Sequence, residues 1–139
     1  MDQNFGSLMP RVTLALRLAM EAELRPLRIT KAQYVVLIAV EQMPSASNAA
    51  LARACYVTPQ TMIEINQSLQ LSGCITRRAD PKHGRIIQTI LTSSGREKLA
   101  AARKVAEKIE GQMLAGLNAE ERQKLASLLQ RCNDNLEAR

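Results

Sequence analysis

Residues 58–91 constrain the fold more than any other part of the chain, because a marked helix start precedes two strand-like runs around a basic turn. Thr58 can accept a hydrogen bond from a free backbone N–H as the N-cap, and Pro59 suits the first helical position. Gly73 is a natural residue to follow the helix end. An inward face is predicted by three apolar residues at helical spacing: Met62, Ile65 and Leu69.

The opposite face of this predicted helix carries polar side chains, which are Gln60, Thr61, Glu64, Gln67 and Ser68. Such groups can hydrogen-bond base edges or phosphates in a DNA groove. The plainer interpretation is a solvated face, which is the usual role of polar residues on an amphipathic helix. The hairpin that follows the helix favours DNA, because it places basic side chains close to this face.

Two runs after the helix, residues 74–78 and 86–91, alternate in strand fashion, and the segment between them is dense in turn residues. This hairpin loop is long enough to project as a wing. Asp80 is interpreted as a turn former that can also orient an arginine. His83 is interpreted as a turn residue near DNA and not a catalytic group, because no nucleophile or carboxylate partner accompanies it.

Positive charge is concentrated in the same segment. The chain has a net charge of +6, and residues 58–96 contain an excess of bases over the two acids Glu64 and Asp80. The bases are Arg77, Arg78, Lys82, Arg85 and Arg96. Few acids lie nearby in sequence to pair with these arginines, so phosphate contact is favoured over surface salt bridges. A short basic segment of this kind indicates a polyanionic partner.

Helical periodicity covers most of the remaining chain. Helices are predicted over residues 5–24, from Thr30 to about 43, briefly after Ser47, over 94–114, and from Asn118 towards the C-terminus. The brief helix, a turn at 56–57 and the helix from Thr58 form a predicted helix-turn-helix. Residues 5–24 are apolar on more than one side, which indicates either a dimer seam or a helix held between two layers.

Composition excludes several classes of protein. The 139 residues suit a single domain, and no apolar run is long enough to span a membrane. The N-terminus lacks a signal-peptide layout, so we expect a cytoplasmic protein. One histidine and three separated cysteines supply no metal-site spacing. No cofactor or metal is expected, and no catalytic residues are predicted, since no glycine-rich phosphate loop or nucleophile–base pair is visible.

Two further groups of residues leave an alternative open. Cys55, Cys74 and Cys132 are interpreted as buried or half-buried thiols, with a redox switch as the alternative. An effector pocket could be lined by Tyr34, Met20, Met43 and Met113. Core packing is the preferred interpretation of these four, and the sequence leaves the identity of effector-binding residues unknown.

Six segments together resemble the MarR family of winged helix-turn-helix regulators. They are 29–37 (ITKAQYVVL), 48–53 (NAALAR), 57–61 (VTPQT), 71–75 (LSGCI), 78–85 (RADPKHGR) and 91–96 (LTSSGR). The resemblance implies a mainly α fold with a small β-hairpin wing, a DNA-binding lobe at about 29–92, and dimerisation helices at about 5–25 and 94–138. It also implies an obligate homodimer whose helix at 58–72 enters the major groove.

On this resemblance, the polar face of that helix contacts bases and the wing contacts phosphates or the minor groove. Arg85 stands where the family has its wing arginine, and His83 stands where the family often has an acid. The predicted DNA-binding set is Thr58, Gln60, Thr61, Glu64, Gln67, Ser68, Arg77, Arg78, Lys82, His83 and Arg85.

The sequence thus predicts a sequence-specific regulator of transcription, a repressor that binds double-stranded DNA as a homodimer on a palindromic operator. Release by a small aromatic ligand or by oxidation is left open. The alternative is a winged-helix protein-interaction module without sequence-specific DNA binding, and Glu64 on the groove-facing helix favours that alternative.

Overall fold

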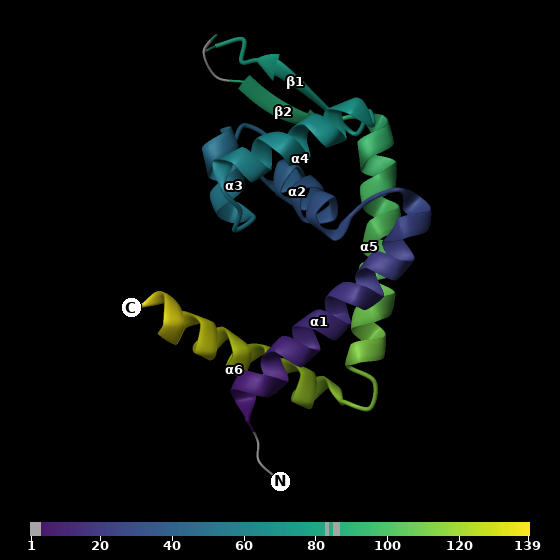
Figure 1. The fold of residues 1–139 in the computed structure, drawn as a ribbon, viewed down its shortest axis with the longest axis vertical. Coiled ribbons are helices and arrows are strands. Elements are labelled where there is room, and N and C mark those ends of the chain that lie inside the picture. Colours follow the sequence, from purple (N-terminus) through teal and green to yellow (C-terminus); the bar gives the residue numbers. More distant parts are fainter. Residues whose placement is uncertain (1–3, 83, 85–86) are drawn as a thin grey trace.

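The computed structural model describes residues 4–82, 84 and 87–139. The chain is mainly helical, with one two-stranded sheet (Figure 1). The elements are α1 (Phe5–Leu24), the short 3-10 turn η1 (Arg25–Leu27), α2 (Lys31–Gln42), α3 (Asn48–Ala54), α4 (Pro59–Leu71), β1 (Ile75–Ala79), β2 (Ile87–Leu91), α5 (Ser93–Met113) and α6 (Ala119–Glu137). The predicted fold class, mainly α with a β-hairpin wing, is therefore confirmed.

Side-chain caps set most helix starts, as the sequence indicated. Thr30 accepts from the N–H of Gln33, and the Gln33 side chain accepts in return from the Thr30 N–H, which forms a capping box. Ser47 caps α3 and Thr58 caps α4 through their hydroxyl oxygens. Asn118 forms a second capping box with Glu121 at the start of α6. These caps satisfy backbone donors that the first helical turn leaves free.

The two strands pair in an antiparallel register that runs from Ile75 opposite Leu91 to Ala79 opposite Ile87. The first strand begins and ends one residue later than predicted, because Cys74 belongs to the turn after α4. Its N–H donates to the carbonyl oxygen of Leu69 at 2.9 Å. The predicted second strand began at Ile86, which lies outside the described residues.

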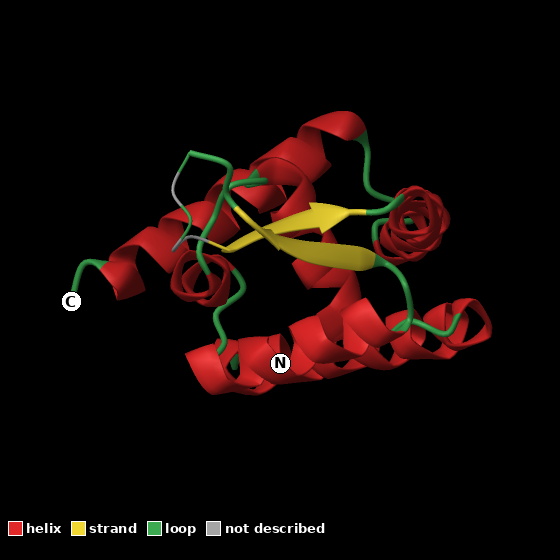
Figure 2. Ribbon diagram, turned by 90° about the horizontal axis from the view of Figure 1, so that it is seen from above, coloured by secondary structure: helices red, strands yellow, loops and turns green. Residues whose placement is uncertain are grey.

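The elements α2, α3, α4, β1 and β2 form one packed unit, which we call the lobe. Figure 2 shows the two-stranded sheet, in yellow, with helices, in red, around it. The core of the lobe contains side chains from every one of its elements. They include Val36, Leu37, Val40, Leu51, Met62, Leu69, Ile75 and Leu91. The end of α1 and the side of α5 complete this core with Met20, Leu24, Leu99 and Ala102. The lobe is thereby fixed to the two long helices.

A close approach joins the end of α4 to the start of α5. A Cβ atom built on Gly95 would lie 2.0 Å from the carbonyl oxygen of Cys74, so only glycine fits there. Thr92, the N-cap of α5, donates from its hydroxyl to the carbonyl oxygen of Gly73 at 2.6 Å, and its N–H donates to the carbonyl oxygen of Cys74 at 3.0 Å. Gly73 itself has a φ of 78°, which favours glycine.

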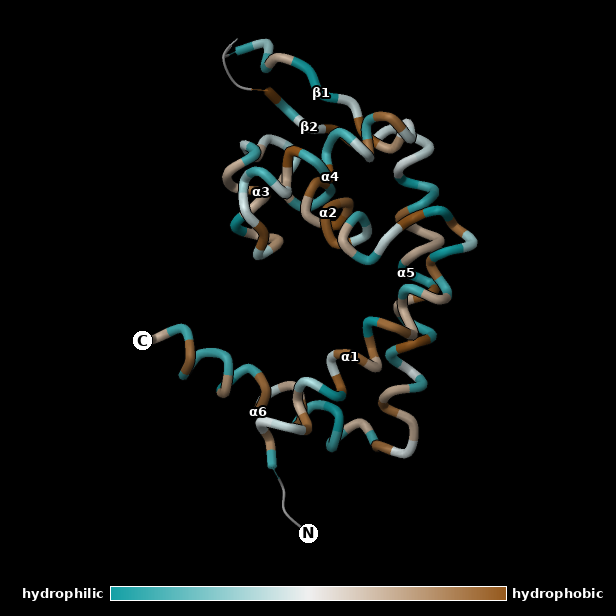
Figure 3. The backbone as a smooth tube through the Cα atoms, in the orientation of Figure 1, coloured by the Kyte–Doolittle hydropathy of each residue, from teal (hydrophilic) through white to brown (hydrophobic). Residues whose placement is uncertain are grey.

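Outside the lobe, much of the apolar surface of α1 and α6 is left uncovered. α6 contains no buried residue, and large apolar side chains on α1 and α6 are exposed. Brown, hydrophobic stretches recur along both helices in Figure 3. The exposed residues are Phe5, Leu8, Met9, Val12, Leu14 and Leu18 on α1, and Leu125, Leu128, Leu129 and Leu136 on α6. The prediction that α1 is apolar on two sides is confirmed.

The three cysteines differ in exposure. Cys74 is buried and Cys55 is half-buried, as expected. Cys132 is exposed, so the expectation of a buried or half-buried thiol is wrong there for the isolated chain. The reason is that Cys132 lies on the same uncovered apolar side of α6 as the leucines.

Candidate nucleic-acid interface

The outer face of α4 presents one continuous polar stripe. Gln60, Glu64 and Gln67 are all exposed, and their spacing of four and then three residues places them along one side of the helix. Leu71 continues this stripe at the end of the helix and is 90% exposed, which the sequence reasoning missed. Met62 and Leu69 are buried on the opposite side, as predicted.

Thr58 and Thr61 are coupled at the start of α4. The Thr58 hydroxyl oxygen accepts from the Thr61 N–H at 3.1 Å, and the same hydroxyl donates to the Thr61 hydroxyl at 2.9 Å. The Thr58 proton is thus used within the helix start, whereas the Thr61 hydroxyl keeps its own proton for another acceptor. Of these two predicted DNA-binding residues, Thr61 therefore has the hydroxyl group that is freer to donate to DNA.

Ser68 lies on the flank of α4 that faces α2. Its hydroxyl accepts from the Gln33 side-chain amide at 2.7 Å, and Gln33 is at the same time part of the α2 capping box. The side chain is exposed, but it is turned towards a neighbouring helix. Ser68 therefore links α4 to the start of α2, and the other polar residues lie closer to the middle of the outer face.

Asn66 is a functional candidate that the sequence reasoning missed. It is completely buried in α4, on the same side as Met62 and Leu69. Its side-chain amide donates to the Asn48 side chain of α3 at 3.1 Å. An asparagine in phase with the apolar positions of an amphipathic helix was the signal that could have identified it.

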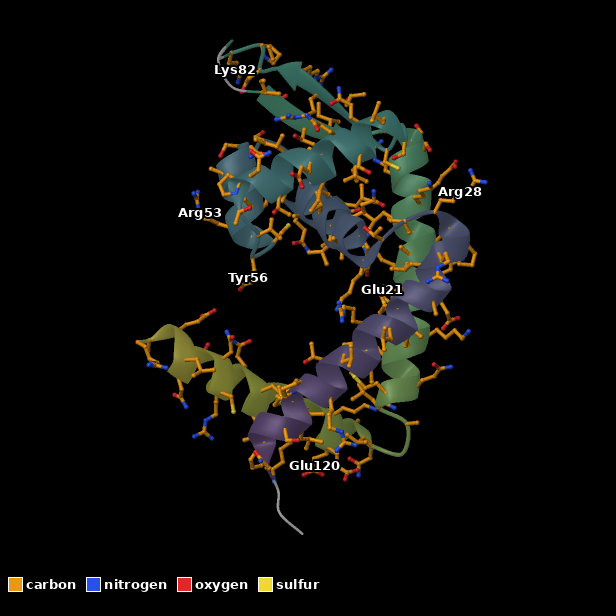
Figure 4. The ribbon with its side chains drawn as sticks, in the orientation of Figure 1. Glu21, Arg28, Arg53, Tyr56, Lys82 and Glu120 are labelled. Atoms are coloured by element: carbon orange, nitrogen blue, oxygen red, sulfur yellow. The ribbon has the colours of Figure 1, made fainter. Side chains whose placement is uncertain are left out.

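The turn between α3 and α4 is tight and carries one exposed aromatic side chain. Tyr56 has a φ of 56°, in the left-handed region, and the Val57 N–H donates to the carbonyl oxygen of Ala52 at 3.0 Å. Figure 4 shows Tyr56 and Lys82 on opposite sides of the lobe. Tyr56, which is 86% exposed, therefore points away from the tip of the hairpin.

The two hairpin arginines lie on opposite faces of the sheet. Arg78 is exposed, while Arg77 is half-buried on the face that also carries Ile75. The strand partner of Arg77 is the buried Thr89, and the buried Nε of Arg77 has no hydrogen-bond partner among the described residues. The two predicted phosphate contacts are consequently not equivalent, and Arg78 is the more accessible one.

The tip of the hairpin begins with an Asx-type turn. The carboxylate of Asp80 accepts from the Lys82 N–H at 2.8 Å, so the interpretation of Asp80 as a turn former is confirmed. Lys82 is exposed at the tip. The predicted contacts His83 and Arg85 lie outside the described residues, and so does any effect of Asp80 on Arg85.

A hollow of about 360 Å³ lies between the lobe and α1. Its lining combines charged side chains from α1 and α2 with apolar ones from α2, the α3–α4 turn and α4, namely Arg17, Glu21, Lys31, Ala32, Val35, Val36, Cys55, Val57 and Ile65. Burial raises the pKa of the Cys55 thiol. A raised pKa disfavours the thiolate, which is the reactive form, so it gives no support to a redox switch at Cys55.

The four residues considered as pocket candidates differ in burial, and Met43, at the end of α2, is half-buried. Met20 is buried and Tyr34 packs against the core, in agreement with the preferred core interpretation. Burial raises the pKa of Tyr34. Met113 is 44% exposed and lines a second hollow, of about 370 Å³, between α1 and α5. A smaller hollow of about 200 Å³ is lined by both Met20 and Met113. None of the four lines the hollow beside the α3–α4 turn.

The described residues offer neither a metal site nor a membrane span. No group of three or more His, Cys, Asp or Glu side chains in residues 4–82, 84 and 87–139 could hold a metal ion. No described helix is both long and apolar enough to cross a membrane.

The MarR family model matches residues 29–87, which correspond to the lobe up to the start of β2. The HTH-type transcriptional repressor Rv2887 of Mycobacterium tuberculosis is 33% identical over 130 residues, which cover 94% of each chain. The crystal structure of Rv2887 in complex with DNA has a TM-score of 0.77 at 31% identity and covers 94% of this chain and 98% of that one.

Rv2887 in complex with salicylic acid has a TM-score of 0.75 at 33% identity, with 94% of this chain and 97% of that one covered. The identity and coverage extend beyond the lobe to the long flanking helices. The TM-scores show that the fold agrees with that of Rv2887 over almost the whole chain. This chain therefore belongs to the MarR family of winged helix-turn-helix transcriptional regulators.

Proposed function

We propose that this protein is a transcriptional repressor that binds a palindromic operator in double-stranded DNA as a homodimer. The lobe, at about 29–92, binds DNA, and the helices at about 5–25 and 94–138 form the dimer. The observation that carries the proposal is the exposed stripe Gln60–Glu64–Gln67, which lies beside a basic hairpin on one packed lobe. A named repressor of this family, Rv2887, supports it.

The contacts divide into two kinds. Gln60, Thr61 and Gln67 on α4 discriminate base pairs, because amide and hydroxyl groups match base edges in the major groove. Glu64 accepts from a cytosine amino group or else repels the DNA. Arg78 and Lys82, with Arg77, His83 and Arg85, contact phosphates or the minor groove and fix the register without reading the sequence.

The homodimer is supported by the exposed apolar sides of α1 and α6. Soluble chains rarely expose such extended apolar surface, and a second copy of the same chain would cover it. Two-fold symmetry then places two α4 helices on one face of the duplex, with half-site centres about 34–36 Å apart. A regulator of this type acts on chromosomal DNA, so the proposed location is the cytoplasm.

The hollow beside the α3–α4 turn is the proposed effector site. Its volume falls in the range of small-ligand pockets, and it combines apolar walls with the two cations Arg17 and Lys31 and the single acid Glu21. A small aromatic acid such as salicylic acid, which occurs in one Rv2887 structure, would place its ring against Val35 and Val57 and its carboxylate near a cation. It releases DNA only if it binds better to the DNA-incompetent arrangement of the lobes.

A titration against duplex DNA at increasing salt tests the binding proposal. Each phosphate contact contributes about 0.9 to the slope of log K against log salt, so a dimer with six or more contacts gives a slope of about −5 or steeper. No salt-dependent affinity for duplex DNA would instead favour the winged-helix interaction module, for which Glu64 is the specific observation.

A second titration tests the effector site. Salicylate added to the protein–DNA complex is expected to lower the affinity for DNA in the wild type. A variant with both Arg17→Ala and Lys31→Ala is expected to lose this response. Lys124→Ala, an exposed cation on α6, serves as the matched control. An equal response in all three proteins would exclude the hollow as the site.

A further inference from the structure

The helix-turn-helix contains a partly buried pair of side-chain hydrogen bonds that joins α3 to α4. Asn66 is completely buried in α4, and its side-chain N–H donates to the Asn48 side-chain oxygen at 3.1 Å. The Asn48 side-chain N–H donates in turn to the backbone carbonyl oxygen of Pro59, the first residue of α4, at 3.3 Å. One half-buried residue of α3 therefore holds α4 at two points along its length.

Stability does not explain this arrangement. The side-chain oxygen of Asn66 is buried and has no hydrogen-bond donor among the described residues. A buried polar atom without a partner costs more than the hydrogen bond on the other side of the amide contributes. An aliphatic side chain of similar shape would pack beside Met62 and Leu69 without this cost.

Hydrogen bonds restrict the orientation of α4 on α3 in a way that apolar contacts do not. Met62 and Leu69 tolerate a small slide or rotation of α4 on α3, because hydrophobic contact has no preferred direction. Hydrogen bonds to Pro59 and Asn66, seven residues apart, fix both the rotation of α4 about its axis and its position along α3. Buried polar groups of this kind are retained in some proteins because they select one register.

The orientation of α4 decides where its outer stripe lies in a groove. Gln60 is adjacent to Pro59, whose backbone oxygen accepts one hydrogen bond, and Gln67 is adjacent to Asn66, whose side chain makes the other. Each hydrogen bond thus restrains a residue next to a predicted base-contacting one. A hydrogen bond to a base edge weakens steeply once its angle or length is wrong. A small rotation of α4 would thus affect base discrimination before it affects phosphate contact.

We propose that Asn48 and Asn66 are positioning residues for operator recognition: they select the orientation of α4 and so set base specificity without contacting DNA. This inference rests on the proposed DNA-binding function and adds to it a determinant that lies inside the protein. The pair raises the preference for the operator over random DNA at some expense of stability.

The test measures base preference and stability in the same variants. Wild-type protein first selects its preferred repeat from a random-sequence duplex library. The affinity ratio between that repeat and random duplex is then measured for Asn66→Leu, Asn48→Ala and the double variant, with the melting temperature of each. Asn48 is half-buried, so its alanine variant folds even if the leucine variant packs badly.

We expect the ratio to fall about tenfold or more in each single variant, which corresponds to one misplaced base contact. The affinity for random duplex is expected to stay unchanged, because the phosphate contacts remain. Asn66→Leu should melt at the same temperature as the wild type or higher. The double variant should show no larger fall than a single one, because both residues act through one connection.

Met62→Leu provides the control, since it changes buried packing on the same side of α4 and removes no directional bond. Its ratio should equal that of the wild type. Ratios within about twofold of the wild type in both asparagine variants would overturn the inference alone. A wild-type protein that selects no repeat would overturn the proposed function, and the inference with it.

Discussion

The lobe and the terminal helix α6 show opposite states of packing, and the first part of α1 resembles α6. Every helix and strand of the lobe contributes side chains to a closed core, including Leu37, Leu51, Met62 and Ile75. In α6 no residue is buried, although its apolar residues recur at helical spacing just as they do in the lobe. The spacing of apolar residues predicts which side of a helix becomes buried, but the surface that covers this side can belong to another copy of the chain.

The difference separates two requirements of an operator-binding protein. A rigid lobe keeps the polar stripe of α4 and the hairpin in one geometry, because its core is complete within one chain. The spacing between two such lobes depends on the helices outside it. Changes in the terminal helices are therefore expected to alter how two lobes bind DNA together. Changes in the lobe are expected to alter one DNA contact at a time.

The largest effect is expected from Leu125→Asp combined with Leu129→Asp on α6. Both leucines are exposed in the single chain, so the monomer keeps its fold, but two carboxylates oppose burial against a partner. Sedimentation should show a monomer. Operator affinity should fall about 10²- to 10⁴-fold, because the second half-site no longer binds intramolecularly.

The matched control for this change is Gln123→Asp, an exposed residue on the opposite side of α6. It should leave both the oligomeric state and the operator affinity as they are. A double-aspartate protein that sediments as a dimer would contradict the assignment of this side of α6 to the partner.

A change in the lobe is expected to act on one contact. Gln60→Ala should cost about 1–3 kcal/mol of binding free energy on the selected operator and little on random duplex, because it removes a base-edge contact. Fluorescence anisotropy with both duplexes measures the two effects. Equal decreases in affinity on both would mean that Gln60 positions the protein and does not discriminate bases.

The hairpin should show a smaller effect that does not depend on sequence. Arg78→Ala is expected to reduce the slope of log K against log salt by about 0.9 if each arginine neutralises one phosphate, and by twice that in a dimer. Arg131→Ala, an exposed cation on α6, is the control. A slope equal to that of the wild type would remove Arg78 from the interface.

The smallest effect is expected at the junction of the two regions, where Glu41 of α2 pairs with Arg103 of α5. Hydrogen bonding from Arg103 lowers the pKa of the Glu41 carboxyl below its ordinary value. The stabilisation is then present above the unfolded-state pKa and is lost as the pH falls through the lower folded-state pKa.

Glu41→Gln is therefore expected to lower the melting temperature slightly at neutral pH, and the difference from the wild type should disappear in acid. Exposed pairs of this kind contribute little, so the shift should be small. Thermal melts of both proteins across the pH range measure it. A difference that persists in acid would assign the effect to packing and not to the charge.

Local signals in the sequence predicted the elements well. Thr58 functions as the predicted N-cap, and the helices predicted from Thr30, after Ser47 and from Asn118 have these residues as their caps. A cap depends on residues only three positions apart, so the local sequence is enough to indicate it. The hairpin begins one residue later than predicted, since the turn after α4 takes Cys74 through a hydrogen bond to Leu69. The residue that closes a helix depends on contacts that the spacing of apolar residues does not encode.

Contacts across elements could not be predicted in this way. Arg77 and Arg78 are neighbours in sequence with the same charge, but strand pairing sends them to opposite faces of the hairpin. The predicted set included Ser68 and omitted Asn66, since only the packed fold shows that Ser68 bonds to Gln33 and that Asn66 bonds to α3. Tertiary partners decide which polar side chains remain available.

The most direct test of the central claim is a selection of genomic fragments by the purified protein at moderate salt, followed by sequencing of the bound DNA. We expect enrichment of an inverted repeat with half-site centres about one helical turn, roughly 34–36 Å, apart. Weak binding to all fragments alike, without an enriched repeat, would contradict a dimeric operator-binding repressor.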